Sequence, residues 1–313
     1  MGALKLFITG AGSYVGLAAA EAAMRAGHAV VVHSRYGHRL HWPDAPGVTP
    51  VTGPLDGPDL AQQMAGCDAV LHIAGRMAGT EAEFTRDVVE ASRAVMRAAR
   101  EAGVPRVVLA GSVSVYGPDR VGTVIDETSP LAPRPEERDA YTRAKLAQER
   151  AMQDEAQGTG LTILRLGAIW GPGRLWNAHI GVARGPVVIR IGREGQIPLC
   201  EIDRAGDALV KAASAPAGIY NILDDDLPDR LRFLNALSAG GWPRLVLPFH
   251  WRILDRIAGN RRGGPGLLRR AVLRARMMPV GWDGQRAVAA LGLDPQHPFE
   301  TLMAANLAEG GAP

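Results

Sequence analysis

The chain has 313 residues, 47% of them hydrophobic and 21% charged, which suits a soluble globular protein that buries a large core. Its formal net charge of +3 argues against a general nucleic-acid-binding protein, and its two cysteines give neither a disulfide framework nor zinc spacing. The sequence shows no secretory signal and no apolar run of about 20 residues that would cross a bilayer. We therefore expect a cytoplasmic protein with no metal site.

Short apolar runs alternate with alanine-rich stretches over the first 170 residues. We expect strands at 6–9, 30–33, 70–73, 107–110 and 162–166, and helices at about 15–26, 58–65, 81–102 and 137–157. Continuous apolar runs are typical of strands buried on both faces. Strand–helix alternation predicts right-handed βαβ units, so the expected fold is α/β, a Rossmann-type doubly wound parallel sheet.

The pattern loosens after Trp170-Gly171-Pro172-Gly173. We expect a strand at 187–191, a helix near 204–214 and a strand at 219–222 to rejoin the sheet. The later residues form helical patches broken by Gly and Pro, which predicts a smaller, mostly helical substrate-binding cap. The predicted division is a dinucleotide-binding domain of residues 1–170, to which 201–224 return, and a cap of residues 171–200 and 225–313.

A glycine-rich turn follows the first predicted strand and leads into a helix. Its residues are Thr9, Gly10, Gly12, Ser13, Tyr14, Val15 and Gly16. Glycines in such a turn let the backbone bend sharply and approach a pyrophosphate at the helix N-terminus. The turn therefore predicts a dinucleotide site.

The end of the second predicted strand indicates which dinucleotide binds. An NAD-binding protein usually has Asp or Glu here, which accepts a hydrogen bond from the ribose 2′-hydroxyl. This chain has Ser34 followed by Arg35 instead, a pair that suits a 2′-phosphate. We expect NADP(H) to be preferred, with NAD(H) possible; the alternative is that Arg35 is a solvated loop cation.

Tyr141 and Lys145 lie four residues apart in the helix expected at 137–157, which places them on one face. An ammonium beside a phenol lowers the pKa of the phenol, which can then exchange a proton near neutral pH. The chain has only three lysines against 32 arginines, so this spacing is unlikely to arise by chance.

These motifs, in this order, resemble the extended short-chain dehydrogenase/reductase superfamily, the type that includes NAD(P)-dependent epimerase/dehydratases. The resemblance covers nearly the whole chain. Beyond the glycine turn and Tyr141-x-x-x-Lys145, it rests on 72–75, 111–117, 165–173, 219–221, 283–287 and Leu291-Gly292. Four positions depart from the family pattern: Ser13, Pro54, Leu166 and Arg204.

The resemblance implies a role for each of three residues. Tyr141 would be the acid/base, and Lys145 would lower its pKa and hold the nicotinamide ribose. Ser112 would hydrogen-bond the substrate carbonyl or alcohol, while the cofactor supplies the hydride.

Further contacts are also expected. The cofactor site would include Ala74 and Gly75, and the substrate site would include Ser114, Tyr116 and Trp170. We interpret Asp87, which stands where the family often has asparagine, as structural. The resemblance implies a homodimer through the helices at 81–102 and 137–157, where the small residues Ala144, Ala147 and Ala151 would permit close packing.

We therefore expect an NADP(H)-dependent oxidoreductase that interconverts a carbonyl and an alcohol of a small-molecule substrate. Only about 27 residues separate Gly173 from Glu201-Ile202-Asp203, a shorter segment than the resemblance leads us to expect of sugar-nucleotide enzymes. Two alternatives stay open, an NAD-dependent nucleotide-sugar epimerase/dehydratase and a non-catalytic dinucleotide-sensing protein.

The segment 249–278 is strongly basic, with eight arginines against Asp255. Apolar residues are interleaved with these arginines. Three interpretations are open: a solvated basic face, a site for an anionic substrate, or an amphipathic helix that lies on a membrane surface.

Overall fold

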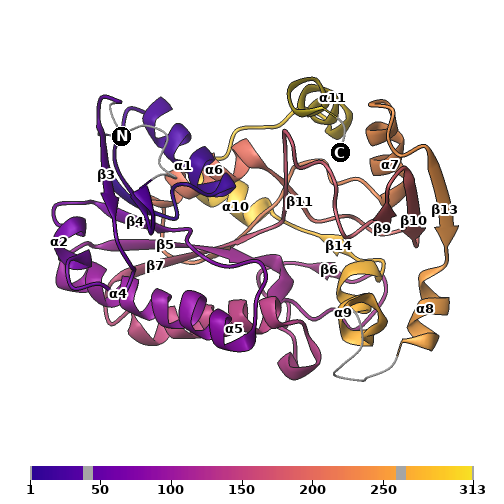
Figure 1. The fold of residues 1–313 in the computed structure, drawn as a ribbon, viewed down its shortest axis with the longest axis horizontal. Helices are drawn as coiled ribbons and strands as arrows, with labels where there is room; N and C mark the ends of the chain where they lie inside the picture. The colour runs from indigo at the N-terminus through magenta and orange to yellow at the C-terminus, as the bar shows by residue number, and fades with distance from the viewer. Residues whose placement is uncertain (1, 38–44, 259–265, 312–313) are drawn as a thin grey trace.

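The computed structural model describes residues 2–37, 45–258 and 266–311. A seven-stranded sheet, with every neighbouring pair parallel, forms its centre in the order β12-β7-β5-β4-β1-β2-β3 (Figure 1). The strands are β1 (Lys5–Thr9), β2 (Ala29–Ser34), β3 (Val48–Thr52), β4 (Ala69–His72), β5 (Arg106–Ser112), β7 (Gly160–Leu166) and β12 (Ile219–Ile222). The predicted Rossmann-type parallel sheet is confirmed.

Helices cover both faces of this sheet, and each face has its own buried apolar cluster. The helices are α1 (Tyr14–Arg25), α2 (Leu60–Met64), α3 (Glu81–Phe84), α4 (Ala91–Glu101), α5 (Ala140–Glu155), α6 (Ile202–Ala212) and α10 (Gln285–Leu291). Helices α1 and α6 lie very close, because a Cβ on Gly206 would lie 2.7 Å from the carbonyl oxygen of Ala18.

The helix expected at 81–102 is interrupted. A π-helical turn, η2 (Thr85–Glu90), separates α3 from α4. The helix expected at 137–157 is present as α5, which begins at Ala140 because Asp139 caps its N-terminus. Of the three alanines expected to permit a dimer contact, Ala144 and Ala151 are buried inside the chain and only Ala147 is exposed.

The second half of the chain adds a cap at one end of the sheet, on the right in Figure 1. It contains β9 (Gly181–Arg184), β10 (Val187–Ile191), β13 (Leu245–Phe249), α7 (Arg230–Ser238), α8 (Trp251–Ile257), α9 (Arg270–Met277) and α11 (Phe299–Gly310). Two short strand pairs, β8 (Ala168–Trp170) with β11 (Leu199–Glu201) and β6 (Val124–Ile125) with β14 (Gly281–Trp282), lie outside the main sheet. The described residues also form the 3₁₀ turns η3 (Val113–Val115), η4 (Pro135–Glu137) and η5 (Gly266–Leu268).

The expectation that the strand at 187–191 rejoins the main sheet is wrong. This strand, β10, forms a hairpin with β9 and pairs in parallel with β13. Gly185, with a φ of 56°, and Pro186 make the tight connection that turns β10 back onto β9. The cap therefore contains a three-stranded sheet as well as helices.

The cap is tied together by the buried guanidinium of Arg230. It donates to the carbonyl oxygens of His179 at 2.7 Å, Glu194 at 2.6 Å and Arg276 at 2.7 Å. The basic segment 249–278 contributes α8 and α9, and its residues 259–265 lie outside the described residues. Among the helices of the described chain, none has the length and apolar character to cross a membrane.

Candidate active site

The glycine turn after β1 has the geometry of a dinucleotide cradle. Gly10 has a φ of 67°, and a Cβ there would lie 2.8 Å from the backbone of Ala74. A Cβ on Gly16 would lie 2.2 Å from the carbonyl oxygen of Gly10. Ser13, which replaces a glycine of the family pattern, caps α1 by accepting from the Gly16 amide at 3.1 Å. These residues fit a pyrophosphate at the start of α1, which is what a nicotinamide dinucleotide requires.

The side chains around this turn brace it. Thr9 Oγ1 accepts from the amides of Ile73 and Ala74, both at 3.1 Å, so β1 and the end of β4 are joined at the turn. Tyr14 donates to the carbonyl oxygen of Pro172 at 3.1 Å, and burial raises the pKa of its phenol to about 12. Of three other expected contacts, Gly12 and Val15 are partly buried and Gly75 is exposed.

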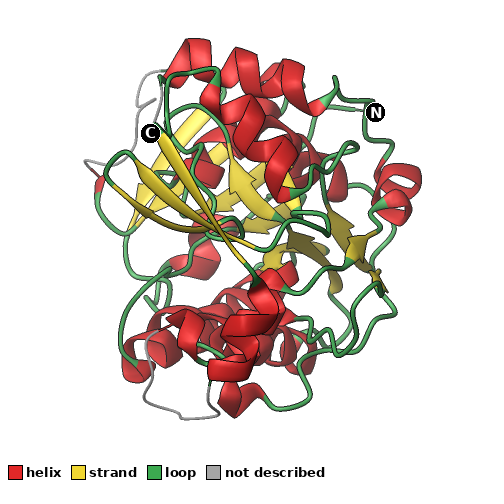
Figure 2. Ribbon diagram, turned by 90° about the vertical axis from the view of Figure 1, so that its right-hand side faces the viewer, coloured by secondary structure: helices red, strands yellow, loops and turns green. Residues whose placement is uncertain are grey.

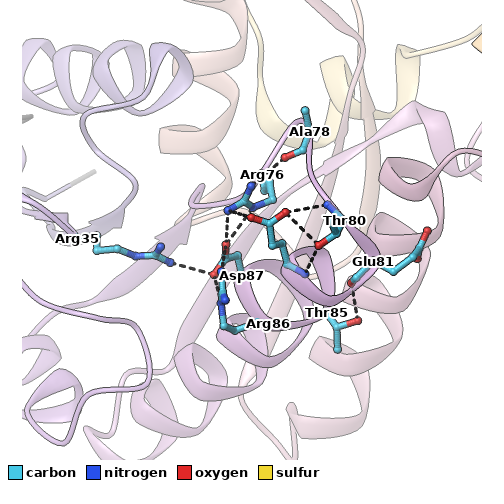
Figure 3. A network of polar contacts seen from close by, with 9 residues as sticks. Arg35, Arg76, Ala78, Thr80, Glu81, Thr85, Arg86 and Asp87 are labelled. Atoms are coloured by element: carbon cyan, nitrogen blue, oxygen red, sulfur yellow. Dashed lines mark hydrogen bonds and ion pairs between the residues drawn. The ribbon is translucent and has the colours of Figure 1, made fainter.

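Ser34 and Arg35 lie at the end of β2, next to a cluster of arginines around Asp87 (Figure 3). Asp87 pairs with Arg35 at 3.3 Å, Arg76 at 2.8 Å and Arg86 at 2.8 Å. The hydrogen bonds from Arg86, with those from Arg76, hold the pKa of the Asp87 carboxyl well below its usual range despite its burial. Arg76 also pairs with Glu83 at 3.3 Å, so three guanidiniums face two carboxylates and one positive charge remains in excess at this edge.

Sequence reasoning missed Arg76 and Arg86. Arg76 directly follows the Ala74-Gly75 pair, which was the signal available for it. Arg86 belongs to the π-helical turn, and the apolar periodicity of the segment gave no sign of that turn.

Ser112, at the end of β5, and Tyr141, in the first turn of α5, come together as expected. Burial raises the pKa of Tyr141, a hydrogen bond with Ser112 opposes that shift, and the nearby Asp139 carboxylate adds to it. The net direction is upward, opposite to the one expected from the Tyr-Lys spacing. The phenol is therefore protonated at neutral pH and can act as a proton donor.

Lys145 is buried under this pair, and its ammonium is held by other groups. Its Nζ donates to the carbonyl oxygen of Ala110 and to Oε1 of Gln148, both at 2.9 Å. Burial lowers the pKa of Lys145 to about 8, and the Glu149 carboxylate opposes that shift. These partners and the burial of the phenol explain why the expected lowering of the tyrosine pKa does not prevail.

A buried chain of hydrogen bonds connects Lys145 to the glycine turn. Gln148 Nε2 donates to Ser92 Oγ at 2.8 Å, and Ser92 Oγ lies 2.8 Å from His72 Nε2. The single Ser92 proton goes to a backbone carbonyl one helical turn earlier, at 2.6 Å, so His72 Nε2 must donate to this serine.

The other ring nitrogen of His72 then accepts from Thr9 Oγ1, which lies 2.8 Å from Nδ1. Burial lowers the pKa of His72 to about 3, which keeps the ring in this neutral form. Every donor direction from Thr9 to Lys145 is thereby fixed. Ser92 and Gln148 were not identified from the sequence, where they are two polar positions in alanine-rich helices.

Two of the residues expected at the substrate site have their polar atoms engaged in the protein interior. Tyr116 donates to Asn221 Oδ1 at 2.7 Å and accepts from Arg165 Nη1 at 2.9 Å, and its ring is buried. Trp170 is fully buried and donates to Asp224 Oδ2 at 2.7 Å. Both rings are packed in buried apolar clusters, so the structure gives neither side chain the role of a substrate contact that was expected of it.

Buried donors without partners gather near the Ser112–Tyr141 pair. Arg138 donates to the carbonyl oxygens of Tyr116 at 2.7 Å and Ser114 at 2.9 Å, while its Nε finds no partner among the described residues. Arg269 Nε and Ser114 Oγ are likewise unpartnered within the described chain. Such groups typically cost roughly 1–3 kcal/mol each, so a ligand that satisfies them gains affinity.

Among all residues that the structure describes, no cluster of three or more His, Cys, Asp or Glu side chains has the arrangement of a metal site.

Comparison with known sequences places this geometry in context. The sequence model of the "NAD dependent epimerase/dehydratase family" matches residues 6–220. The chain is 31% identical over 257 residues to a 2-alkyl-3-oxoalkanoate reductase of Shewanella oneidensis, covering 74% of this chain and 65% of the relative. It is 32% identical over 247 residues to a 3-beta-hydroxysteroid dehydrogenase of Mycolicibacterium neoaurum, covering 71% and 66%.

A third relative is a 4-hydroxy-2-methyl-3-oxo-4-farnesyl-3,4-dihydroquinoline-1-oxide ketoreductase of Stigmatella aurantiaca, 30% identical over 54% of this chain and 51% of the relative. The chain thus spans between about half and two thirds of the length of these relatives.

Solved structures share the fold along the whole chain. A short-chain dehydrogenase/reductase superfamily protein from Agrobacterium tumefaciens with bound NAD superposes with a TM-score of 0.73 at 18% identity, covering 97% of this chain and 96% of that one. A UDP-glucuronic acid 4-epimerase from Bacillus cereus in complex with NAD gives a TM-score of 0.73 at 15% identity, covering 96% and 97%.

Proposed function

Since the chain belongs to the NAD dependent epimerase/dehydratase family, we propose that it is an NADP(H)-dependent oxidoreductase that interconverts a carbonyl and an alcohol. The observation that carries this proposal is the position of Ser112 and Tyr141 beside Lys145, which a chain of hydrogen bonds connects to the dinucleotide turn. The cofactor, when bound, supplies or accepts the hydride. Tyr141 gives its proton to the carbonyl oxygen, and Ser112 hydrogen-bonds that oxygen as negative charge develops on it.

Lys145 has a positioning and electrostatic part in this proposal. Its buried ammonium, fixed by Ala110 and Gln148, stabilises the phenolate that Tyr141 becomes after it gives up its proton. The same ammonium would also hold the nicotinamide ribose. The hydrogen-bond chain through Ser92 and His72 fixes the position of Lys145 relative to the turn that would hold the pyrophosphate.

The unpartnered guanidinium nitrogens of Arg138 and Arg269 favour a carbonyl substrate that carries an anionic group. The names of the relatives are consistent with carbonyl chemistry, since they include a ketoreductase and an oxoalkanoate reductase. The nucleotide-sugar epimerase alternative draws on the family, whose name includes epimerases, and on solved structures that share only the fold.

A substrate screen tests the proposed activity. We expect NADPH to be consumed, read as loss of absorbance at the reduced-nicotinamide band, and we expect 4-oxooctanoate to be reduced faster than its methyl ester. The two compounds share the ketone and the chain, and the ester removes the negative charge while adding only a methyl group. The epimerase would be favoured instead if the cofactor stays bound through purification and no carbonyl compound causes net oxidation of NADPH.

The cofactor preference is tested by Arg35→Gln. A lost charge-assisted bond to a 2′-phosphate typically costs about tenfold or more in affinity. We expect the Kd for NADPH to rise by that factor and the Kd for NADH to stay nearly constant, as measured by quenching of protein fluorescence. Arg25→Gln is the matched control, because Arg25 is a surface arginine that pairs with Asp207 at the far end of α1. Tighter binding of NADH than of NADPH by the unmodified protein would contradict the proposal.

A further inference from the structure

The three-stranded sheet of the cap has an apolar face that is exposed to solvent. On β10, Val188 is fully buried, while its neighbour Ile189 is 41% exposed. The strand register places Val182 and Leu247 on either side of Ile189, and both are 47% exposed. The row that these three side chains form across the sheet therefore points away from the core.

The same face extends along β13 and continues into α8. Leu245 and Phe249 lie two residues on either side of Leu247 on β13, which places them on the same face, and they are 50% and 38% exposed. Helix α8 begins two residues after β13 ends, and it exposes Ile253 and Ile257, one helical turn apart. The solvent side of a sheet is normally polar, so this arrangement needs a reason. We call the residues Val182, Ile189, Leu245, Leu247, Phe249, Ile253 and Ile257 the apolar face.

The segments that carry the apolar face are rich in positive charge. Over residues 181–194 and 244–257, the exposed charged side chains are Glu194 and five arginines: Arg184, Arg193, Arg244, Arg252 and Arg256. The other carboxylate of these segments, Asp255, is engaged by Arg274 at 2.8 Å and Arg270 at 3.8 Å. Figures 1 and 2 place these strands and α8 at the outer end of the cap, away from the central sheet.

The charge decides between two kinds of occupant. A second copy of the chain docked through the same face would bring the two sets of arginines together, which is unfavourable. An anionic lipid surface matches both features, because apolar side chains enter the headgroup boundary while arginines contact the lipid phosphates. We propose that the apolar face docks the protein reversibly on a membrane surface that contains anionic lipid. This proposal does not depend on the proposed reaction.

Vesicle co-sedimentation tests the docking proposal. We expect the protein to partition onto phosphatidylcholine vesicles that contain phosphatidylglycerol at least about tenfold more than onto phosphatidylcholine alone, and to be released by salt. Leu247→Asp should lower that partitioning by about tenfold or more. The matched control is Val121→Asp, since Val121 has a similar exposure of 48% but lies outside the apolar face, and this variant should bind as the unmodified protein does.

A second variant guards against misfolding of the first. Arg252→Gln combined with Arg256→Gln leaves the apolar residues intact and should weaken binding to the phosphatidylglycerol vesicles only. The proposal is overturned if the unmodified protein does not bind these vesicles, or if Leu247→Asp binds them as strongly as the unmodified protein does. It is also overturned if sedimentation shows a dimer that Leu247→Asp dissociates in the absence of vesicle binding, because the face would then join two copies.

Discussion

Replacement of Tyr141 by phenylalanine is expected to lower kcat for carbonyl reduction by about 10²–10⁴-fold, the usual contribution of a general acid. The change removes the proton donor beside Ser112 and leaves the ring in place. That ring packs against the small cluster of Phe84, Val88 and Ala144, so phenylalanine fits the same space. Steady-state kinetics would measure the loss, and a fluorescence titration should show nearly unchanged affinity for NADPH.

The matched control for this variant is Tyr220→Phe. The Tyr220 hydroxyl donates to the carbonyl oxygen of Pro216 at 3.0 Å, at the start of β12, so it makes one hydrogen bond away from Ser112. Its loss should leave kcat unchanged. Full turnover by Tyr141→Phe would contradict the acid/base role proposed for this residue. If neither the unmodified protein nor Tyr141→Phe shows turnover, and both have the same biological activity, a dinucleotide sensor would be favoured.

Most of the strands that were predicted correctly, β1, β2, β4, β5 and β7, have nearly continuous apolar runs and lie inside the sheet. Strand β12 was also predicted, although it lies at an edge, because most of its residues are buried. Strand β3 was missed because it lies at the sheet edge, contains Pro50 and has no fully buried residue. Strands β9 and β13 were missed for a similar reason. On β13 the exposed residues are as apolar as those between them, and β9 has only four residues, with Arg184 exposed on the same face as Val182, so neither alternation nor a long run distinguishes them from cap loops.

The candidate site divides in the same way between local and non-local signals. Tyr141 and Lys145 are four residues apart in one helix, so the sequence alone predicts that they lie on the same helix face. The cluster around Asp87 draws Arg35 from the end of β2 and Arg76 from the end of β4, and no local pattern connects those segments. The position of Ser92 opposite Gln148 depends on how α4 packs against α5. The residues proposed to react were therefore easier to select from the sequence than the residues that contact and orient them.

A buried ion pair beneath the site is expected to dominate the effect of mutations on stability. Glu149 accepts from Arg165 through two hydrogen bonds, Oε1 from Nε at 3.1 Å and Oε2 from Nη2 at 2.8 Å. Both side chains are about 95% buried, with exposures of 5% and 4%. Arg165 also donates to Tyr116, whose hydroxyl donates to Asn221, so the pair connects α5 with β7 and β12.

Glu149→Gln should therefore lower the free energy of unfolding by about 3–5 kcal/mol, because it leaves the Arg165 guanidinium buried without a counter-charge. Urea denaturation would measure the change. Glu155→Gln is the matched control, since it makes the same substitution two turns later in α5, where the carboxylate pairs with the exposed Arg97.

Glu155→Gln should lower the free energy of unfolding much less than Glu149→Gln does, because solvent already screens the Arg97 charge. Removal of both buried charges, by Glu149→Leu with Arg165→Leu, should recover part of the loss, since the penalty comes from an unpaired charge more than from the absent bond. A loss for Glu149→Gln no larger than that for Glu155→Gln would mean that the Arg165 charge reaches water when its partner is removed. The interior beneath Ser112 and Tyr141 would then be less rigid than its hydrogen bonds imply.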